Sequence, residues 1–279
     1  MVAAERLGIS AALLTPFEAD GSVNLPVFAS HARGVLERGA SSVTIFGTTG
    51  EGASLSAAER LDGLRYLLEE GVLQEQVLLA VYACAVSDAV QQINAAIKLG
   101  VTNFLLVPPF YYKGCSDDGL FAWHSELLRT VPRNANFVIY HIPQVTGVPL
   151  SFELTERLAK NFRDQLIGVK DSSGDWEYTS KLLTSSTLPV LVGDERQLHR
   201  AAALGGAGTI TGMANIYPDR MRSIFESGTE DSELSNQVSR ILKHPVVPAL
   251  KSLVARDTGR KSWERVRAPL EPLGVGSCL

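Results

Sequence analysis

The chain has 279 residues, a mass of 30.1 kDa and a formal net charge of −4, which is enough polypeptide for one large domain with a sizeable core. Hydrophobic residues make up 45% of the sequence and charged residues 20%, as in an ordinary globular protein. The slight acidity gives no basis for binding nucleic acid or an anionic membrane. No apolar run approaches the roughly 18 residues that a membrane-spanning helix needs.

The first apolar segment, "LGISAALL" at 7–14, has some features of a signal peptide core. Few positive charges precede it, and it continues directly into Thr-Pro-Phe without a small-residue cleavage pattern. We therefore interpret it as the first strand and expect a cytoplasmic protein. The three cysteines show no CxxC spacing, which fits free thiols in a reducing compartment: Cys84, Cys115 and Cys278.

Strand-length apolar segments alternate with helix-length amphipathic segments along most of the chain. The predicted strands are 8–17, 42–47, 76–83, 103–109, 137–143, 166–171, 189–194 and 208–215. The predicted helices lie near 25–38, 56–70, 87–99, 117–130, 151–161, 175–185, 197–205 and 217–227. Ser56 followed by Glu59 is a capping box at the start of one of these helices.

This strict alternation predicts a parallel sheet with helical crossovers, and eight such units over about 228 residues match a (β/α)8 TIM barrel. An open doubly wound sheet is the alternative, although no G-x-G-x-x-G sequence follows the first strand. We expect residues 1–228 to form the barrel. Residues 229–279 carry helical patterns and are expected to pack on the barrel as part of one structural unit.

Several polar motifs follow predicted strands, where barrel enzymes place their chemistry. The glycines and threonines of "GTTGEGASLS" (47–56) could present backbone amides and hydroxyls to a ligand, or form an ordinary turn. The aromatic loop "PPFYYKG" (108–114) could be an interface or a surface loop. "YHIP" (140–143) offers a phenol and an imidazole, or a plug for the barrel. "GDE" (193–195) could bind a polar ligand or cap the next helix.

Lys170 lies near the end of the apolar strand "LIGVKD" and is the strongest candidate for a catalytic residue. Side chains alternate along a strand, so Lys170 shares a face with Gly168, and that face is the barrel interior if Ile167 and Val169 face the helices. Loss of hydration there favours a neutral amine, which is a nucleophile for carbonyl carbon. The alternative is a lysine that forms an ion pair with Asp171 or Asp194.

With these motifs in order, the chain resembles the dihydrodipicolinate synthase / N-acetylneuraminate lyase family of class I, pyruvate-dependent aldolases. The resemblance covers nearly the whole chain, from "LLTPF" through "GTTGE", "PPFYY", "YHIP", "GVKD" and "GDE" to "GGAGTITGMAN". It implies a TIM barrel that acts on small-molecule 2-oxo acids and aldehydes. It also implies a homotetramer built as a dimer of dimers, or a homodimer.

The resemblance also implies roles for individual residues. Lys170 matches the Schiff-base lysine, and Tyr140 matches the tyrosine of the family's "Y-N-x-P", a proton relay. Thr48 matches a threonine that links this tyrosine to a second one from a neighbouring subunit. That second tyrosine is Tyr111 or Tyr112, and we favour Tyr111. The expected substrate-binding residues are Gly47, Thr49, Gly50, His141, Val145, Gly193 and Ile210.

Two positions depart from the family pattern. His141 replaces the asparagine that follows the relay tyrosine. Val145 stands where the synthases carry an arginine that resembles a clamp for the carboxylate of the second substrate, and valine cannot form such a pair. The pyruvate half of the site matches the family, whereas the half for the second substrate does not match lysine biosynthesis.

We therefore expect a Schiff-base lyase that cleaves or forms a 2-keto-3-deoxy sugar acid-type substrate. The alternatives are a 4-hydroxy-tetrahydrodipicolinate synthase, which condenses pyruvate with aspartate semialdehyde, and a non-catalytic barrel that binds a 2-oxo acid. A further alternative is a pyridoxal phosphate enzyme with its phosphate at "GGAG" (205–208). We expect no metal and no cofactor, because the iminium on Lys170 would itself polarise the substrate.

Overall fold

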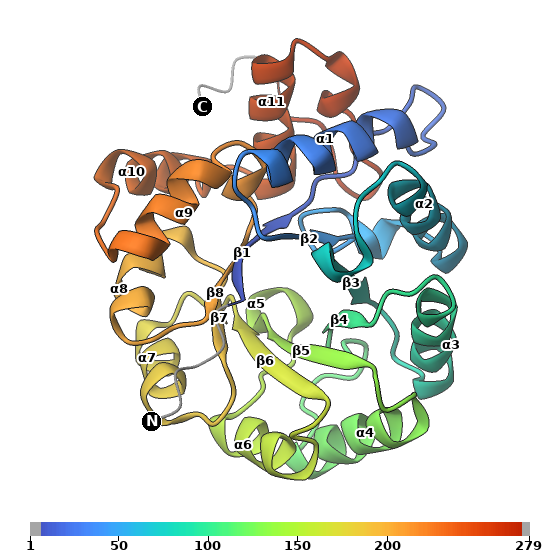
Figure 1. The fold of residues 1–279 in the computed structure, drawn as a ribbon, viewed down its shortest axis with the longest axis vertical. Helices are drawn as coiled ribbons and strands as arrows, with labels where there is room; N and C mark the ends of the chain where they lie inside the picture. Colours follow the sequence, from blue (N-terminus) through green and yellow to red (C-terminus); the bar gives the residue numbers. More distant parts are fainter. Residues whose placement is uncertain (1–6, 275–279) are drawn as a thin grey trace.

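A computed structural model describes residues 7–274 and shows a closed barrel of eight parallel strands in the order β1 to β8 (Figure 1). Pairing of β1 with β8, from Gly8 with Gly208 to Ala11 with Thr211, closes the barrel. The predicted (β/α)8 TIM barrel is confirmed. Its strands are β1 (Gly8–Ala12), β2 (Ser42–Ile45), β3 (Val77–Val81), β4 (Asn103–Leu106), β5 (Asn136–His141), β6 (Leu166–Asp171), β7 (Val190–Val192) and β8 (Gly208–Thr211).

Helices surround the barrel as a ring in which each crossover lies between consecutive strands. The ring and its additions are α1 (Leu25–Glu37), α2 (Ala57–Glu69), α3 (Val86–Ile97), α4 (Asp117–Thr130), α5 (Pro143–Thr146), α6 (Phe152–Asn161), α7 (Trp176–Ser185), α8 (Leu198–Ala203), α9 (Pro218–Ser227), α10 (Ser232–Ile241) and α11 (Val246–Thr258). Short 3-10 turns are η1 (Gly52–Ser54), η2 (Gln74–Gln76), η3 (Glu195–Gln197), η4 (Met213–Asn215) and η5 (Lys261–Glu264).

Local sequence signals account for many helix ends. The predicted capping box is present: the Ser56 hydroxyl accepts from the Glu59 backbone N–H, and the Glu59 carboxylate accepts from the Ser56 N–H. These bonds satisfy backbone donors that the first turn of a helix leaves free. Asn24 caps α1 in a similar way, with its side chain accepting from the Val27 N–H at 3.0 Å.

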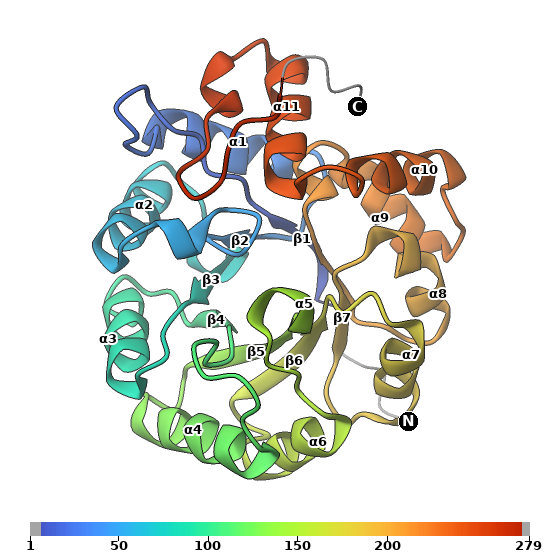
Figure 2. The same ribbon diagram turned by 180° about the vertical axis from the view of Figure 1, so that it is seen from behind.

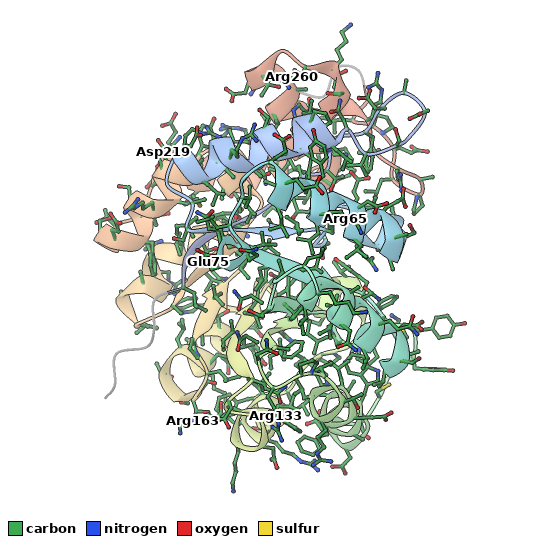
Figure 3. All side chains as sticks on the ribbon, turned by 45° about the vertical axis from the view of Figure 1, so that its right-hand side comes forward. Arg65, Glu75, Arg133, Arg163, Asp219 and Arg260 are labelled. Atoms are coloured by element: carbon green, nitrogen blue, oxygen red, sulfur yellow. The ribbon has the colours of Figure 1, made fainter. Side chains whose placement is uncertain are left out.

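Alternation of side chains along the strands produces two separate cores. One lies between the strands and the helices, and the other fills the barrel interior with Leu78, Leu105, Tyr140, Leu191 and Ile210 among its members. Figure 3 shows that side chains occupy the space on both sides of the strands, while charged groups extend at the periphery. Six exposed examples are labelled there: Arg65, Glu75, Arg133, Arg163, Asp219 and Arg260.

Several strands are shorter than predicted, because the chain leaves the sheet early where the site is built. The segment predicted as strand 8–17 is regular only over Gly8–Ala12, and 208–215 divides into β8 and η4. The Asn215 amide explains this division: its Nδ2 donates to the Ala12 carbonyl at 2.8 Å and its Oδ1 accepts from the Leu14 N–H at 3.0 Å. A side chain thus replaces the sheet hydrogen bonds beyond β1.

The helices after α9 stand beside the barrel rather than in the ring. In Figures 1 and 2, α10 lies next to α9, and α11 lies next to α1. Trp263 of η5 is buried and packs edge-on against His31 of α1, with 4.8 Å between ring centroids. The structure therefore fixes the C-terminal segment against the first crossover helix through a buried aromatic contact.

Candidate active site

A cavity of about 440 Å³ lies at the C-terminal ends of the barrel strands, on the side from which Figure 2 shows α5 in front of the strands. Its wall includes the ends of β5, β6 and β8, the loops after β2 and β7, and parts of α5, α10 and α11. The structure brings together here these predicted site residues: Lys170, Tyr140, Thr48, Thr49, Val145, Gly193 and Ile210.

Lys170 and Tyr140 are direct neighbours across the β5–β6 pair. Both side chains point into the barrel and are nearly inaccessible, with 5% and 2% of their surfaces exposed. The Lys170 Nζ lies 4.1 Å from the centroid of the Tyr140 ring. The predicted inward face of β6 is therefore the face that the structure shows, and a phenol stands beside the amine.

The two aspartates that could have paired with Lys170 are engaged elsewhere. Asp171 faces away from the barrel interior, where its carboxylate accepts from the Thr179 hydroxyl at 2.5 Å and from the Ser173 backbone N–H at 3.0 Å. Asp194 forms a two-point contact with Arg196, with distances of 3.0 and 2.7 Å. Lys170 therefore contributes an amine that is not held in an ion pair by either aspartate.

In the loop after β2, two positions have room for glycine only. A Cβ on Gly52 would lie 1.8 Å from the Phe46 carbonyl oxygen, and one on Gly50 would lie 2.6 Å from the Leu13 carbonyl oxygen. Glu51 between them adopts the left-handed conformation, with φ of 56°. Gly47 and Gly50 shape this loop without lining the cavity, whereas Thr48 and Thr49 line it.

Thr48 has a tyrosine partner within its own chain that the sequence analysis missed. Its Oγ1 lies 3.4 Å from the Tyr82 hydroxyl, and burial raises the pKa of Tyr82. Tyr82 follows β3 on the same inward face as Leu78 and Ala80, so alternation along the strand could have identified it. Tyr111 and Tyr112 instead are 74% and 73% exposed.

His141 lies outside the cavity wall. It follows Tyr140 on β5 and therefore faces the opposite side of the strand, where it is buried. Its Nδ1 accepts from the Leu150 backbone N–H at 3.0 Å, and its ring lies 4.5 Å from the Tyr178 ring, centroid to centroid. Burial lowers the pKa of His141. These contacts make it a packing residue between β5 and the segment that leads into α6.

Polar groups gather on one side of the cavity, along the ends of β6 and β7. This polar wall consists of Ser172, Ser173, Asp194, Glu195 and Arg196. The Glu195 carboxylate accepts from the Thr211 hydroxyl and from the Met213 backbone N–H, and burial raises its pKa. The wall therefore offers hydroxyls, carboxylates and one guanidinium that is already paired with Asp194.

Lys113 does not reach the cavity. Its ammonium donates to the Phe110 carbonyl and to the Thr146 carbonyl, which ties the aromatic loop to the end of α5. Val145, on α5, lines the cavity and is 59% exposed. The position that matches the synthase arginine is therefore at the cavity, and an aliphatic side chain occupies it.

No described helix is both long and apolar enough to cross a membrane. Within residues 7–274, no group of three or more His, Cys, Asp or Glu side chains is placed to hold a metal ion. Cys84 and Cys115 are free thiols, and Cys278 lies outside the described residues.

A model of the dihydrodipicolinate synthetase family matches residues 5–275 of the chain. The chain belongs to this family. It is 35% identical to an uncharacterized DapA-like lyase of Chloroflexus aurantiacus, over 97% of this chain and 93% of that protein. It is 29% identical to the 4-hydroxy-tetrahydrodipicolinate synthase of Thioalkalivibrio sulfidiphilus, over 79% of this chain and 74% of the relative.

The structural comparison agrees with this assignment. The crystal structure of dihydrodipicolinate synthase from Agrobacterium tumefaciens is similar with a TM-score of 0.94 and 42% identity, over 97% of this chain and 95% of that one. As a member of the dihydrodipicolinate synthetase family, the protein is a lyase of the pyruvate-dependent class. One of these relatives is an uncharacterized lyase and the other is a 4-hydroxy-tetrahydrodipicolinate synthase, so membership of the family leaves the second substrate open.

Proposed function

We propose that this protein is an aldolase that forms a Schiff base between Lys170 and a 2-oxo acid. One observation carries the proposal: the inward Lys170 amine, the Tyr140 phenol and the Thr48 hydroxyl share one cavity at the C-terminal end of the barrel. A buried amine beside an aromatic ring and without a carboxylate partner is suited to attack a ketone.

The reaction uses the groups of the site in sequence. The Lys170 amine attacks C2 of the 2-oxo acid, and water leaves as Tyr140 supplies a proton, which gives an iminium. Tyr140 then takes the proton of the C4 hydroxyl, the C3–C4 bond breaks, and its electrons form an enamine while an aldehyde departs. Protonation at C3 and hydrolysis release pyruvate and restore Lys170. Condensation is the same sequence reversed.

The loop of residues 47–52, which we call the carboxylate loop, is the proposed site for the carboxylate of the substrate. Thr48 and Thr49 line the cavity beside Tyr140, and the backbone around Gly50 and Gly52 is packed too closely to admit a side chain at either position. Oriented donors that need no rearrangement stabilise a carboxylate and the charge that develops near it. Binding there would place C2 of the substrate near the Lys170 amine.

Tyr82 is the proposed second partner of Thr48 in the proton relay. The 3.4 Å separation of the two hydroxyls is long, and such contacts commonly shorten when substrate binds. Tyr111 of a neighbouring subunit is the other candidate for the second tyrosine, since a homotetramer or homodimer could bring it close to Thr48. Tyr82→Phe and Tyr111→Phe distinguish them: we expect Tyr82→Phe to lower kcat with little change in KM for pyruvate. A loss confined to Tyr111→Phe would assign the relay to the neighbouring subunit.

The proposed substrate is a hydroxylated 2-oxo acid of the 2-keto-3-deoxy sugar acid type. Val145 cannot bind a distal carboxylate, and Arg196, the guanidinium that lines the cavity, is already paired with Asp194. Hydroxyls of a sugar chain match the polar wall, which contains Ser172 and Ser173. The alternative is condensation of pyruvate with aspartate semialdehyde, the reaction that the names of several relatives describe.

Reduction with borohydride in the presence of pyruvate tests the proposed function. We expect a three-carbon adduct on Lys170 and loss of activity, whereas Lys170→Arg should yield no adduct. Lys181→Arg is the control, because Lys181 is exposed and pairs with Glu153 far from the cavity. An adduct on another lysine would overturn the role of Lys170. Absence of any adduct would overturn the Schiff-base mechanism and favour a barrel that binds a 2-oxo acid without turnover.

A further inference from the structure

The side of the cavity that α10 and α11 contribute has no polar side chain. Its members are aliphatic: Val238, Ile241, Leu242, Val246, Val247 and Leu250. We call this set the aliphatic wall. It belongs to the same cavity as Lys170, and the polar wall from β6 and β7 is part of that cavity too.

The aliphatic wall divides into a buried part and an open part. Val238, Ile241 and Leu250 have 3%, 3% and 2% of their surfaces exposed, as expected for core residues. Leu242 and Val246, in contrast, are 48% and 39% exposed, although both line the cavity. Apolar surface is thus open to solvent at a cavity that already contains the reactive amine.

Leu250 connects the wall to the reacting end of the site. A Cβ on Gly212 would lie 2.6 Å from the Leu250 Cδ1 and 3.5 Å from the Thr49 Cγ2. The aliphatic wall therefore begins next to the carboxylate loop and extends outward to Leu242 and Val246 at the mouth. A substrate held by its carboxylate near Thr49 would place its far end along this wall.

We propose that the aliphatic wall binds an apolar terminus of the aldehyde half of the substrate. The inference rests on the proposed function and narrows its substrate class to a 2-oxo-4-hydroxy acid that ends in a methyl or longer alkyl group. A 2-keto-3-deoxy sugar acid with a terminal CH3 in place of CH2OH is complementary to both the polar wall and the aliphatic wall. Its inner hydroxyls meet the polar wall, and its methyl group meets the aliphatic one. A terminal hydroxyl against the buried part of the wall, formed by Val238, Ile241 and Leu250, would lose its hydrogen bonds to water without gaining a partner.

Condensation of pyruvate with two matched aldehydes tests this inference. Lactaldehyde and glyceraldehyde differ only in a terminal CH3 or CH2OH. The inference predicts that kcat/KM favours lactaldehyde by about fivefold or more, because burying an unpaired hydroxyl costs about 1–3 kcal/mol and each 1.4 kcal/mol is a factor of about ten. Unbranched aldehydes should gain about fourfold for each methylene that the wall covers. Equal rates, or a preference for glyceraldehyde, would overturn it.

Variants at the open end of the wall sharpen the test. Leu242→Asn and Val246→Thr keep the approximate size of each side chain and add polar atoms, so they should reduce the preference for lactaldehyde severalfold. Leu204→Asn is the control, because Leu204 is 42% exposed and does not line the cavity. If Leu242→Asn changes the molar mass in solution and leaves the aldehyde preference intact, the wall is covered by a second copy and the inference is wrong.

The borohydride experiment distinguishes failure of the aliphatic subsite from failure of the proposed Schiff-base function. An adduct on Lys170 together with no alkyl preference would reject the aliphatic subsite and retain the Schiff-base aldolase. Absence of the adduct would reject the proposed function itself, whatever the wall binds.

Discussion

The buried ion pair between Glu51 and Lys251 gives the sharpest prediction of stability. Glu51 lies in the loop of residues 47–52, Lys251 is on α11, and both side chains are completely buried. The Lys251 ammonium also donates to the Arg265 carbonyl at 2.6 Å and lies 4.3 Å from the centroid of the Phe17 ring. Burial lowers the pKa of Lys251 to about 8, and the charge of Glu51 opposes that shift.

Glu51→Gln removes one charge and leaves the other buried without its counterion. Breaking such a pair costs about 3–5 kcal/mol of unfolding free energy. Unfolding entropy for a chain of 279 residues is about 0.6 kcal/mol/K, so the melting temperature should fall by about 5–9 °C. The double variant Glu51→Gln/Lys251→Met should recover most of this loss, because the uncompensated charge causes it.

Urea unfolding of the four proteins of this double-mutant cycle measures the coupling. Glu70→Gln is the matched control, since it removes a carboxylate from the exposed Arg33–Glu70 pair and should cost less than about 1 kcal/mol. A coupling energy below about 0.5 kcal/mol would refute the reasoning. The KM for pyruvate should rise in Glu51→Gln, because the Glu51 carboxylate also accepts from the Arg267 backbone N–H at 2.8 Å and so holds in place the loop proposed to bind the substrate carboxylate.

Three further measurements address the site and its surroundings. Tyr140→Phe should lower kcat by about 10²–10⁴-fold while pyruvate binding, followed by calorimetry, is retained; an unchanged rate would make Tyr140 a packing residue. Val145→Arg should improve condensation with aspartate semialdehyde by about tenfold or more relative to a sugar aldehyde, and efficient condensation by the unmodified protein would contradict the proposed specificity. Burial lowers the pKa of His31 and of His124 from 6.5 to about 4, so the unfolded chain binds more protons between these values and stability is lost as the pH falls through this window. Lowering the pH from 7 to 5 should reduce the free energy of unfolding, measured by urea titration, by about 2 kcal/mol for each histidine. His124→Gln should make this reduction smaller by the share of His124, and an unchanged reduction would show that another group causes it.

Local patterns in the sequence were sufficient to predict the architecture and the side of β6 on which Lys170 lies. The alternation of strands and helices predicted the barrel, because each element carries its own period of apolar residues. The same two-residue period placed Lys170 on the inward face of β6, and the register with Tyr140 then follows from parallel pairing. The same alternation would also have placed His141 on the outward face of β5, away from the cavity, and Tyr82 on the inward face that continues from β3.

Only the tertiary structure decided what surrounds these residues. The pairing of Glu51 with Lys251, the contact of Leu250 with Gly212, and the aliphatic wall join segments that lie far apart in the chain. The sequences of α10 and α11 have the pattern of any amphipathic helix, and that pattern does not specify which surface the apolar face of the helix covers. That choice depends on the shape and charge of the barrel rim against which the helices pack, and the rim exists only after the eight strands have closed.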